Sequence, residues 1–245
     1  MGPSTRTGLD PQLDRAIAAS NLAALPDDAL LQFTRGARRV AIDAGDTIHR
    51  EGDDDPHVEL VVSGLVRVFV SATDGRTMTI RYCRRGALIG VATVFGQQKP
   101  RSFAVQALTV SDLLRLRPDC IRDTVDHDPR ATKAMLRETS ERVMAFTAEL
   151  SGSTFATVRE RLARHLLDLA SEQQRGEELI ALVTQQELAD AVGTVREVIV
   201  RELRGLRADG IVETRRDGIA IVDPEGLVPA LDQRRTETAQ GNTRS

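Results

Sequence analysis

Three arginines and a glutamate share one face of a predicted helix near the C-terminal end of the sequence: Arg196, Glu197, Arg201 and Arg204. At about 100° per residue, these side chains and Val200 lie within roughly 140° of one another. Arginine can donate two parallel hydrogen bonds to O6 and N7 of guanine, and glutamate can accept one from N4 of cytosine. A helix with this face fits the major groove of DNA.

The opposite face of the same helix is apolar and is made of Val195, Val198, Ile199, Leu203 and Leu206. These side chains fall between roughly 200° and 340° from the first arginine. We therefore expect them to be buried against another helix. A surface helix with solvated charges would show the same pattern, so the neighbouring segments decide between the two interpretations.

The neighbouring segments favour DNA binding. Thr184 lies three residues before Glu187, the spacing of a capping box at a helix start, and Gly193 suits the positive φ of a tight turn between helices. Residues 211–214 and 219–222 alternate around an Asp-Gly turn and predict a β-hairpin. Helix, turn, helix and hairpin together predict a winged helix-turn-helix.

Composition gives only a weak electrostatic signal for nucleic acid. The chain has 245 residues, 41% of them hydrophobic, which suits one large domain or two modest ones. Its net charge is −3, and between residues 196 and 216 six arginines face four acids. We expect specific base contacts to matter more than general attraction to phosphates.

Several other protein classes are disfavoured. Cys83 and Cys120 are too few for an iron–sulfur cluster, and the histidines lack metal-ligand spacing. No apolar run is long enough to cross a bilayer and no signal peptide is visible, so we expect a reduced cytoplasmic setting without membrane partners. Without a nucleophile–base pair or a glycine-rich phosphate loop, we predict no catalytic residues, no metal site and no enzyme activity.

The N-terminal part has a different texture. We predict short helices over residues 11–34 and then strands at 38–42, 58–62, 65–71, 77–82, 103–108 and 112–116. Short strands with glycines at their corners are typical of a double-sheet jelly roll.

One long helix is predicted over residues 129–151. Leu136, Val143 and Leu150 recur every seven residues, and Phe146 adds another apolar position. About three heptads, with one polar interruption, give a marginal coiled-coil signal, and a helix packed on its own barrel is the alternative. We favour a homodimer interface formed by these four residues, because helix-turn-helix proteins usually read two half-sites.

This order of a β-roll, a long central helix and a winged helix resembles the cyclic-AMP receptor protein family of bacterial regulators, the Crp–Fnr superfamily, over roughly residues 25–222. The strongest match runs from residue 184 to 201, because family members carry Arg-Glu-x-x-x-Arg at the start of the recognition helix. The resemblance implies that Arg196, Glu197 and Arg201 read guanine- and cytosine-containing pairs of a palindromic TGTGA-like site.

The same resemblance implies a wider set of DNA-contacting residues. The set is Thr184, Gln186, Thr194, Val195, Arg196, Glu197, Val200, Arg201 and Arg204. Thr184 matches a phosphate-contacting position. Val200 stands where the founding member has a small residue, so its isopropyl group would touch a thymine methyl or shift the helix outward.

Residues 86–92 and 100–105 resemble the family's phosphate-binding cassette, which holds a cyclic nucleotide. Arg101 and Ser102 match the phosphate-binding pair, although Arg101 could equally be a structural salt-bridge partner. Val91, which follows Gly90, stands where the family has a glutamate that accepts a hydrogen bond from a ribose hydroxyl. A buried unpaired hydroxyl costs about 1–3 kcal/mol, which is roughly a five- to 150-fold loss of affinity.

The adenine-contacting Thr-Ser pair of the family is also changed, to Phe146 and Thr147. We therefore expect weak or absent cyclic-AMP binding and no certain cofactor. The effector is then a different cyclic nucleotide or another small anion, or the protein is active without one. The cysteine cluster of the oxygen-sensing branch is missing, and no haem ligand pair can be assigned.

The resemblance implies an α+β chain with a cyclic-nucleotide-binding-like β-roll. Its expected divisions are 1–24 (flexible N-terminus and short helix), 25–128 (effector-binding β-roll), 129–151 (dimerisation helix), 155–223 (winged helix-turn-helix) and 224–245 (tail). Residues 151–154 are the expected hinge. The expected function is a homodimeric regulator that binds double-stranded DNA, with RNA polymerase as a further partner. The alternative is a cyclic-nucleotide-binding module that gates another protein.

Overall fold

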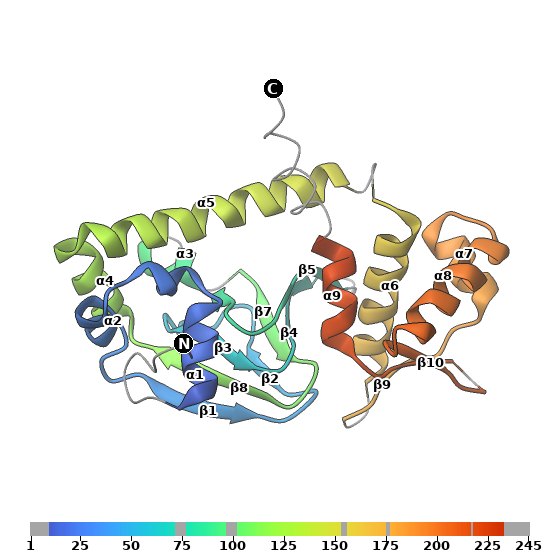
Figure 1. The fold of residues 1–245 in the computed structure, drawn as a ribbon, viewed down its shortest axis with the longest axis horizontal. Helices are drawn as coiled ribbons and strands as arrows, with labels where there is room; N and C mark the ends of the chain where they lie inside the picture. The colour runs from blue at the N-terminus through green and yellow to red at the C-terminus, as the bar shows by residue number, and fades with distance from the viewer. Residues whose placement is uncertain are drawn as a thin grey trace, which may run out of the picture. The chain divides into compact units, whose positions relative to one another are not determined.

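The structure, a computed structural model, describes residues 10–71, 77–96, 102–152, 156–174, 177–216 and 218–232. Side chains at positions 77–78, 148–152, 172, 190 and 229–232 lie outside the description. The chain divides into two compact units, Met1–Ser151 and Gly152–Ser245, and each is described by itself (Figure 1).

The described part of the first unit contains two four-stranded antiparallel sheets. One has the order β1 (Arg38–Ile42), β8 (Ser111–Leu116), β3 (Val58–Ser63) and β6 (Leu88–Ile89). The other has the order β2 (Thr47–His49), β7 (Ala104–Ala107), β4 (Val66–Ser71) and β5 (Thr77–Cys83). The predicted jelly-roll strands are confirmed within one or two residues. β2 and β6 were not predicted, because three and two residues are too few to show alternation.

Strand β3 explains how this unit builds its core, because it is buried on both faces. Leu60 and Val62 belong to an apolar cluster that the helices cover. Val61 belongs to a second cluster that contains residues of both sheets, including Val66 and Val105. Since successive side chains of a strand point to opposite faces, Glu59 lies on the same side as Val61.

Helices cover the outer apolar cluster. They are α1 (Pro11–Ala18), the 3-10 helix η1 (Asn21–Ala24), α2 (Asp27–Phe33), α3 (Val91–Phe95), α4 (Pro118–His127) and α5 (Pro129–Gly152). The short helices predicted over 11–34 are confirmed. Asp10 caps α1 by accepting a hydrogen bond from the Gln12 backbone at 3.0 Å, and Ile17 and Leu22 are buried in the cluster. Residues 10–24 therefore form part of the core, whereas residues 1–9 lie outside the described part.

The long helix α5 runs past its predicted end (Figure 1). It includes Ser151 and Gly152, so the first half of the expected hinge is helical, and residues 153–155 lie outside the described part. Its first turns pack on the β-roll through Ala131, Ala134 and Met135.

The second unit combines helices with a small antiparallel sheet. Its elements are α6 (Val158–Gln173), β9 (Leu179–Ala181), α7 (Gln185–Val192), α8 (Arg196–Ala208), β10 (Val212–Thr214), β11 (Ile219–Ile221) and α9 (Pro224–Asp232). The predicted hairpin is confirmed as β10–β11, and β9 extends it to three strands. A Cβ on Gly218 would lie 2.3 Å from the Ala181 carbonyl oxygen, so the close approach of β9 requires glycine there.

The segment expected as a C-terminal tail begins with the helix α9, which buries Leu227 and Val228. In the part of the chain that the structure describes, no helix combines the length and apolarity that crossing a lipid bilayer requires.

Candidate nucleic-acid interface and effector site

The first helix of the predicted helix-turn-helix begins with the expected capping box. The Thr184 backbone N–H donates to Glu187 Oε2 at 2.8 Å, and the Glu187 backbone N–H donates to Thr184 Oγ1 at 3.2 Å. Hydrogen bonds from the backbone and side chain of Thr184 hold the pKa of Glu187 below its ordinary value. This local structure is confirmed.

The turn after α7 depends on Gly193, which has a φ of +71°. A Cβ at this position would meet no atom within 4 Å, so glycine is required by the backbone conformation and not by a lack of space. The Thr194 backbone N–H donates to the Ala189 carbonyl at 2.9 Å, which closes α7 in the manner of a Schellman motif. Helix α8 then begins with Val195 as its N-cap residue.

Helix α8 separates its side chains as the sequence predicts. Ile199, Leu203 and Leu206 are buried, and the four charged residues of the opposite face, Arg196, Glu197, Arg201 and Arg204, are exposed. Val200 is half-buried among them. The prediction fails at Val195, which is 58% exposed because it precedes the first helical turn.

The arginines of this face are available to a ligand. Within the described residues, Arg196 and Arg204 have no hydrogen-bond or ion-pair partner. Arg201 Nη2 lies 3.4 Å from Glu202 Oε1, and an exposed pair of this kind contributes little stability. Thr184 and Gln186 are exposed at the start of α7, and Thr194 is half-buried in the turn.

Other arginines of this unit are already engaged, although the sequence counts them in the same local charge. Arg207 Nη1 donates to Thr214 Oγ1 at 2.9 Å, which links α8 to β10. Arg215 Nη1 lies 3.3 Å from Glu178 Oε2, which links the hairpin to the segment before β9. These contacts separate the arginines that brace the fold from those that face outward.

The segment that resembles the cassette is apolar at Val91, the position where the resemblance leads us to expect a carboxylate. Gly90 has a φ of 87° and precedes α3, and Thr93 Oγ1 donates to the Gly90 carbonyl at 2.6 Å. Val91 is 7% exposed and belongs to the helix-covered apolar cluster together with Val94. The Val91 side chain therefore has no hydrogen-bond acceptor for a sugar hydroxyl.

The remaining predicted effector residues are less completely described. Arg101 lies outside the described residues, so the phosphate-binding pair stays a prediction, and Ser102 is exposed. Phe146 and Thr147 are exposed on α5. The Thr147 hydroxyl donates to the Val143 carbonyl at 2.9 Å, so the backbone of the helix already uses its proton.

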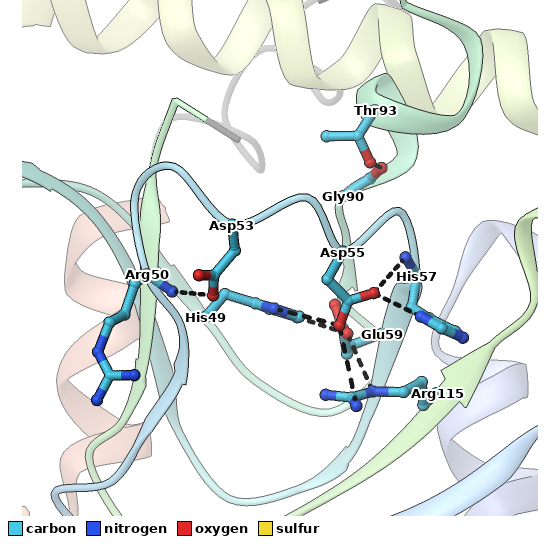
Figure 2. Close-up of polar contacts among 9 residues, drawn as sticks. All are labelled: His49, Arg50, Asp53, Asp55, His57, Glu59, Gly90, Thr93 and Arg115. Carbon is cyan, nitrogen blue, oxygen red and sulfur yellow. Dashed lines mark hydrogen bonds and ion pairs between the residues drawn. The ribbon is translucent and has the colours of Figure 1, made fainter. Parts of the chain in front are cut away.

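A group of ionisable side chains that the sequence analysis missed, two of them buried, lies beside the segment that contains Gly90 (Figure 2). His49 Nε2 is 2.6 Å from Glu59 Oε1, and both side chains are 1% exposed. Because β2 and β3 belong to different sheets, this pair joins the two sheets through their interior. Glu59 pairs with Ile89 in the β3–β6 register, one residue before Gly90.

Arg115 and Asp55 complete this group. Arg115 Nε lies 3.5 Å from Glu59 Oε1, and its Nη1 lies 3.9 Å from Asp55 Oδ2. Asp55 Oδ1 accepts a hydrogen bond from the His57 backbone at 3.0 Å. Partial burial raises the pKa of the Asp55 carboxyl, but hydrogen bonds from His57 and the nearby imidazoles outweigh it and lower the pKa to about 2.

These charges are not arranged as a metal site. Among the described residues, no group of three or more histidines, cysteines or acids could hold a metal ion. The only sequence signal for the group is a single glutamate inside the apolar strand of residues 58–62. A lone acid in such a strand is the pattern of a buried charge that needs a partner.

Two family models match the chain. Residues 39–128 match the cyclic nucleotide-binding domain, and residues 160–229 match the Crp-like helix-turn-helix domain. The first match contains both sheets from β2 onward, and the second contains α7, α8 and the hairpin.

Two curated relatives and one solved structure extend this comparison. The chain is 25% identical over 203 residues to the CRP-like cAMP-activated global transcriptional regulator of Mycobacterium tuberculosis, covering 81% of this chain and 90% of the relative. It is 27% identical over 207 residues to the transcriptional regulator SdrP of Thermus thermophilus, covering 82% and 98%. The structure of the c-di-GMP responsive global regulator CLP of Xanthomonas campestris superposes with a TM-score of 0.51 at 24% identity, covering 79% and 98%.

The lowered pKa of Asp55 predicts a specific pH dependence. A carboxyl whose folded pKa lies below its ordinary value of 3.8 stabilises the fold above that value and loses the contribution as the pH falls toward about 2. We expect Asp55→Asn to lower the free energy of unfolding at pH 7, and the difference from wild type to shrink below about pH 4. Denaturant titrations between pH 7 and pH 3 measure it.

Asp54→Asn is the matched control, because Asp54 is exposed in the same loop. We expect this variant to follow the wild-type curve. Identical pH profiles for the two variants would show that the Asp55 contacts contribute nothing particular to stability.

Proposed function

This chain belongs to the Crp/Fnr family of DNA-binding transcription regulators, and we propose that it binds as a homodimer to a palindromic TGTGA-like site, with α8 reading one half-site in each copy. The observation that carries the proposal is the division of α8. One face is buried through Ile199, Leu203 and Leu206, and the other exposes arginines that, among the described residues, are not committed to strong contacts within the fold.

Each residue of the exposed face has a role in this proposal. Arg196 and Arg201 donate to guanine O6 and N7, and Glu197 accepts from cytosine N4. Val200 contributes an apolar contact to a thymine methyl. The polar residues around the turn, Thr184, Gln186 and Thr194, contact phosphates and fix the register of the helix on the duplex, as does Arg204. Val195 is exposed beside them and packs against the DNA backbone.

The dimer interface that we propose lies on α5. Leu136 and Val143 are 66% and 58% exposed, and Phe146 is also exposed, whereas Ala134 and Met135 on another side of the helix are buried. Large apolar side chains exposed in one stripe mark an interaction surface. A second copy of α5 would cover them. The side chain of Leu150, the next heptad position, lies outside the described part, so its place in the interface stays a prediction.

For the effector, we infer that cyclic AMP is not the natural ligand. The support is Val91, which is buried in an apolar cluster where a ribose hydroxyl would need an acceptor. The matched relatives are described as responding to different nucleotides, cAMP in one case and c-di-GMP in another. The effector of this chain is another small anion, or the dimer is active without one. We assign its action to the cytoplasm, with RNA polymerase as the partner through which a DNA-bound dimer changes transcription.

Base reading is tested by Arg196→Ala. We expect a loss of about 1–3 kcal/mol in the free energy of binding to the palindromic TGTGA-like site and a relaxed preference at one base position. Gel-shift titrations against that palindrome and against a random duplex measure both effects. Arg38→Ala, an exposed arginine of the other unit, is the control and should bind as wild type. Equal losses on both duplexes would show that Arg196 does not read bases.

The dimer interface is tested by Val143→Glu. A carboxylate in the apolar stripe would lose its hydration on association, so we expect sedimentation velocity to show monomers at concentrations where wild type is dimeric. Arg137→Gln changes the net charge by the same amount about 120° around the helix and should stay dimeric. If the Val143→Glu variant is still dimeric, α5 does not form the dimer interface.

The effector inference is tested by titrating cyclic AMP into wild type and Val91→Glu in a calorimeter. Restoring the carboxylate should tighten binding roughly five- to 150-fold, the value of one buried hydroxyl contact. Val91→Leu controls for repacking of the cluster and should bind as weakly as wild type. Equally tight binding by wild type would show that cyclic AMP needs no acceptor at this position.

A further inference from the structure

The start of α6 is held by a second capping box. The Thr157 backbone N–H donates to Glu160 Oε2 at 2.6 Å, and the Glu160 backbone N–H donates to Thr157 Oγ1 at 3.2 Å. Glu160 is buried. Because Thr157 is the N-cap residue of α6, this box fixes the backbone at the start of that helix.

The next residue, Arg161, connects this helix start to the helix-turn-helix. Its Nε donates to the Val192 carbonyl at 2.9 Å, and its Nη1 donates to the Ala156 carbonyl. Val192 is the last residue of α7, where carbonyl groups have no partner within the helix. The Thr194 backbone N–H already donates to the Ala189 carbonyl. The Arg161 guanidinium therefore supplies a further hydrogen bond to the end of α7 from a different helix.

An arginine suits this position for two physical reasons. Its planar guanidinium presents several N–H donors in a fixed arrangement, so it can hold two carbonyl oxygens on different segments at once. Its positive charge also interacts favourably with the C-terminal end of a helix. A lysine ammonium carries the same charge but is a single point on a flexible stem.

Arg159 makes a parallel connection to the other helix of the motif. Its Nη2 donates to Asp209 Oδ2 at 2.9 Å, and Asp209 is the C-cap residue of α8. Its Nη1 lies 3.0 Å from where a Cβ on Gly205 would stand, so this side chain packs over α8. The first turn of α6 is therefore tied to the ends of both α7 and α8.

We propose that Arg161 is a positioning residue for base reading: it holds the turn between α7 and α8 in one register with the first turn of α6. Helix α8 starts only a few residues after Val192, so a shift of this turn reorients Arg196 and Glu197. Arg161 itself contacts no base. The inference rests on the proposed function, because it concerns how the recognition helix is presented to DNA.

The test separates positioning from a direct phosphate contact by comparing Arg161→Gln with Arg161→Lys. Affinities are measured for the selected palindrome and for a random duplex over a range of salt concentrations, with circular dichroism to verify folding. We expect both variants to bind the palindrome about tenfold more weakly. This loss is the lower end of the range for removing one hydrogen bond to a charged group. Random-duplex affinity and the salt slope should match those of Arg38→Gln, which removes an exposed arginine from the other unit.

Two results would overturn the proposal. If Arg161→Lys binds as wild type and Arg161→Gln lowers the salt slope by about one, Arg161 is a phosphate contact. If neither variant changes the ratio of specific to random binding, it has no positioning role. Where Arg161→Gln does not fold, Arg161→Lys alone decides between these outcomes.

A second measurement does not depend on DNA. Hydrogen exchange of the backbone amides from Gly193 to Ile199 should be faster in both variants than in wild type, because the turn loses its outside partner. Unchanged exchange there would contradict the proposal. If wild type and Arg38→Gln show no preference for any DNA sequence while the exchange rates differ as expected, the proposed function fails and the structural role of Arg161 stands.

Discussion

The burial of one face of α8 is the constraint on which the DNA-binding interpretation depends. Ile199, Leu203 and Leu206 cannot be exposed without losing the free energy of apolar burial, so the helix has a single favourable rotation about its axis. That rotation puts Arg196 and Arg201 outward. The groups that we propose to read bases are therefore oriented by buried apolar side chains on the opposite face of the helix.

A turn with little freedom completes this arrangement. Gly193 adopts a conformation that other residues reach only with strain, and the end of α7 is closed by Thr194 from within and by Arg161 from α6. The turn between the two helices is thus held by hydrogen bonds from two different elements. Its position matters for the proposed function because bidentate hydrogen bonds to base edges depend on geometry.

The β-roll contains polar contacts in its interior as well as apolar packing. The His49–Glu59 pair lies inside the roll and joins its two sheets, and Arg115 approaches the same carboxylate. Removing either partner would leave a buried polar group of the other without its hydrogen bond, which is destabilising. Glu59 pairs with Ile89, which belongs to the cassette-like segment of residues 86–92, so the group lies beside that segment. Val91, in the same segment, is buried in the apolar cluster that the helices cover.

Local patterns in the sequence determined the helix-turn-helix, the hairpin and most strands of the β-roll, because each depends on residues only a few positions apart. Thr184 with Glu187, Gly193 and the two faces of α8 are of this kind. Tertiary structure alone decided the third strand β9, the inter-sheet pair of His49 and Glu59, and the connection of Arg161 to Val192. Their partners lie ten to more than thirty residues apart, and no periodicity in the chain relates them. Such contacts form only when the fold brings the two segments together, so hydrophobic spacing can predict the elements but not the polar bonds that fix their positions.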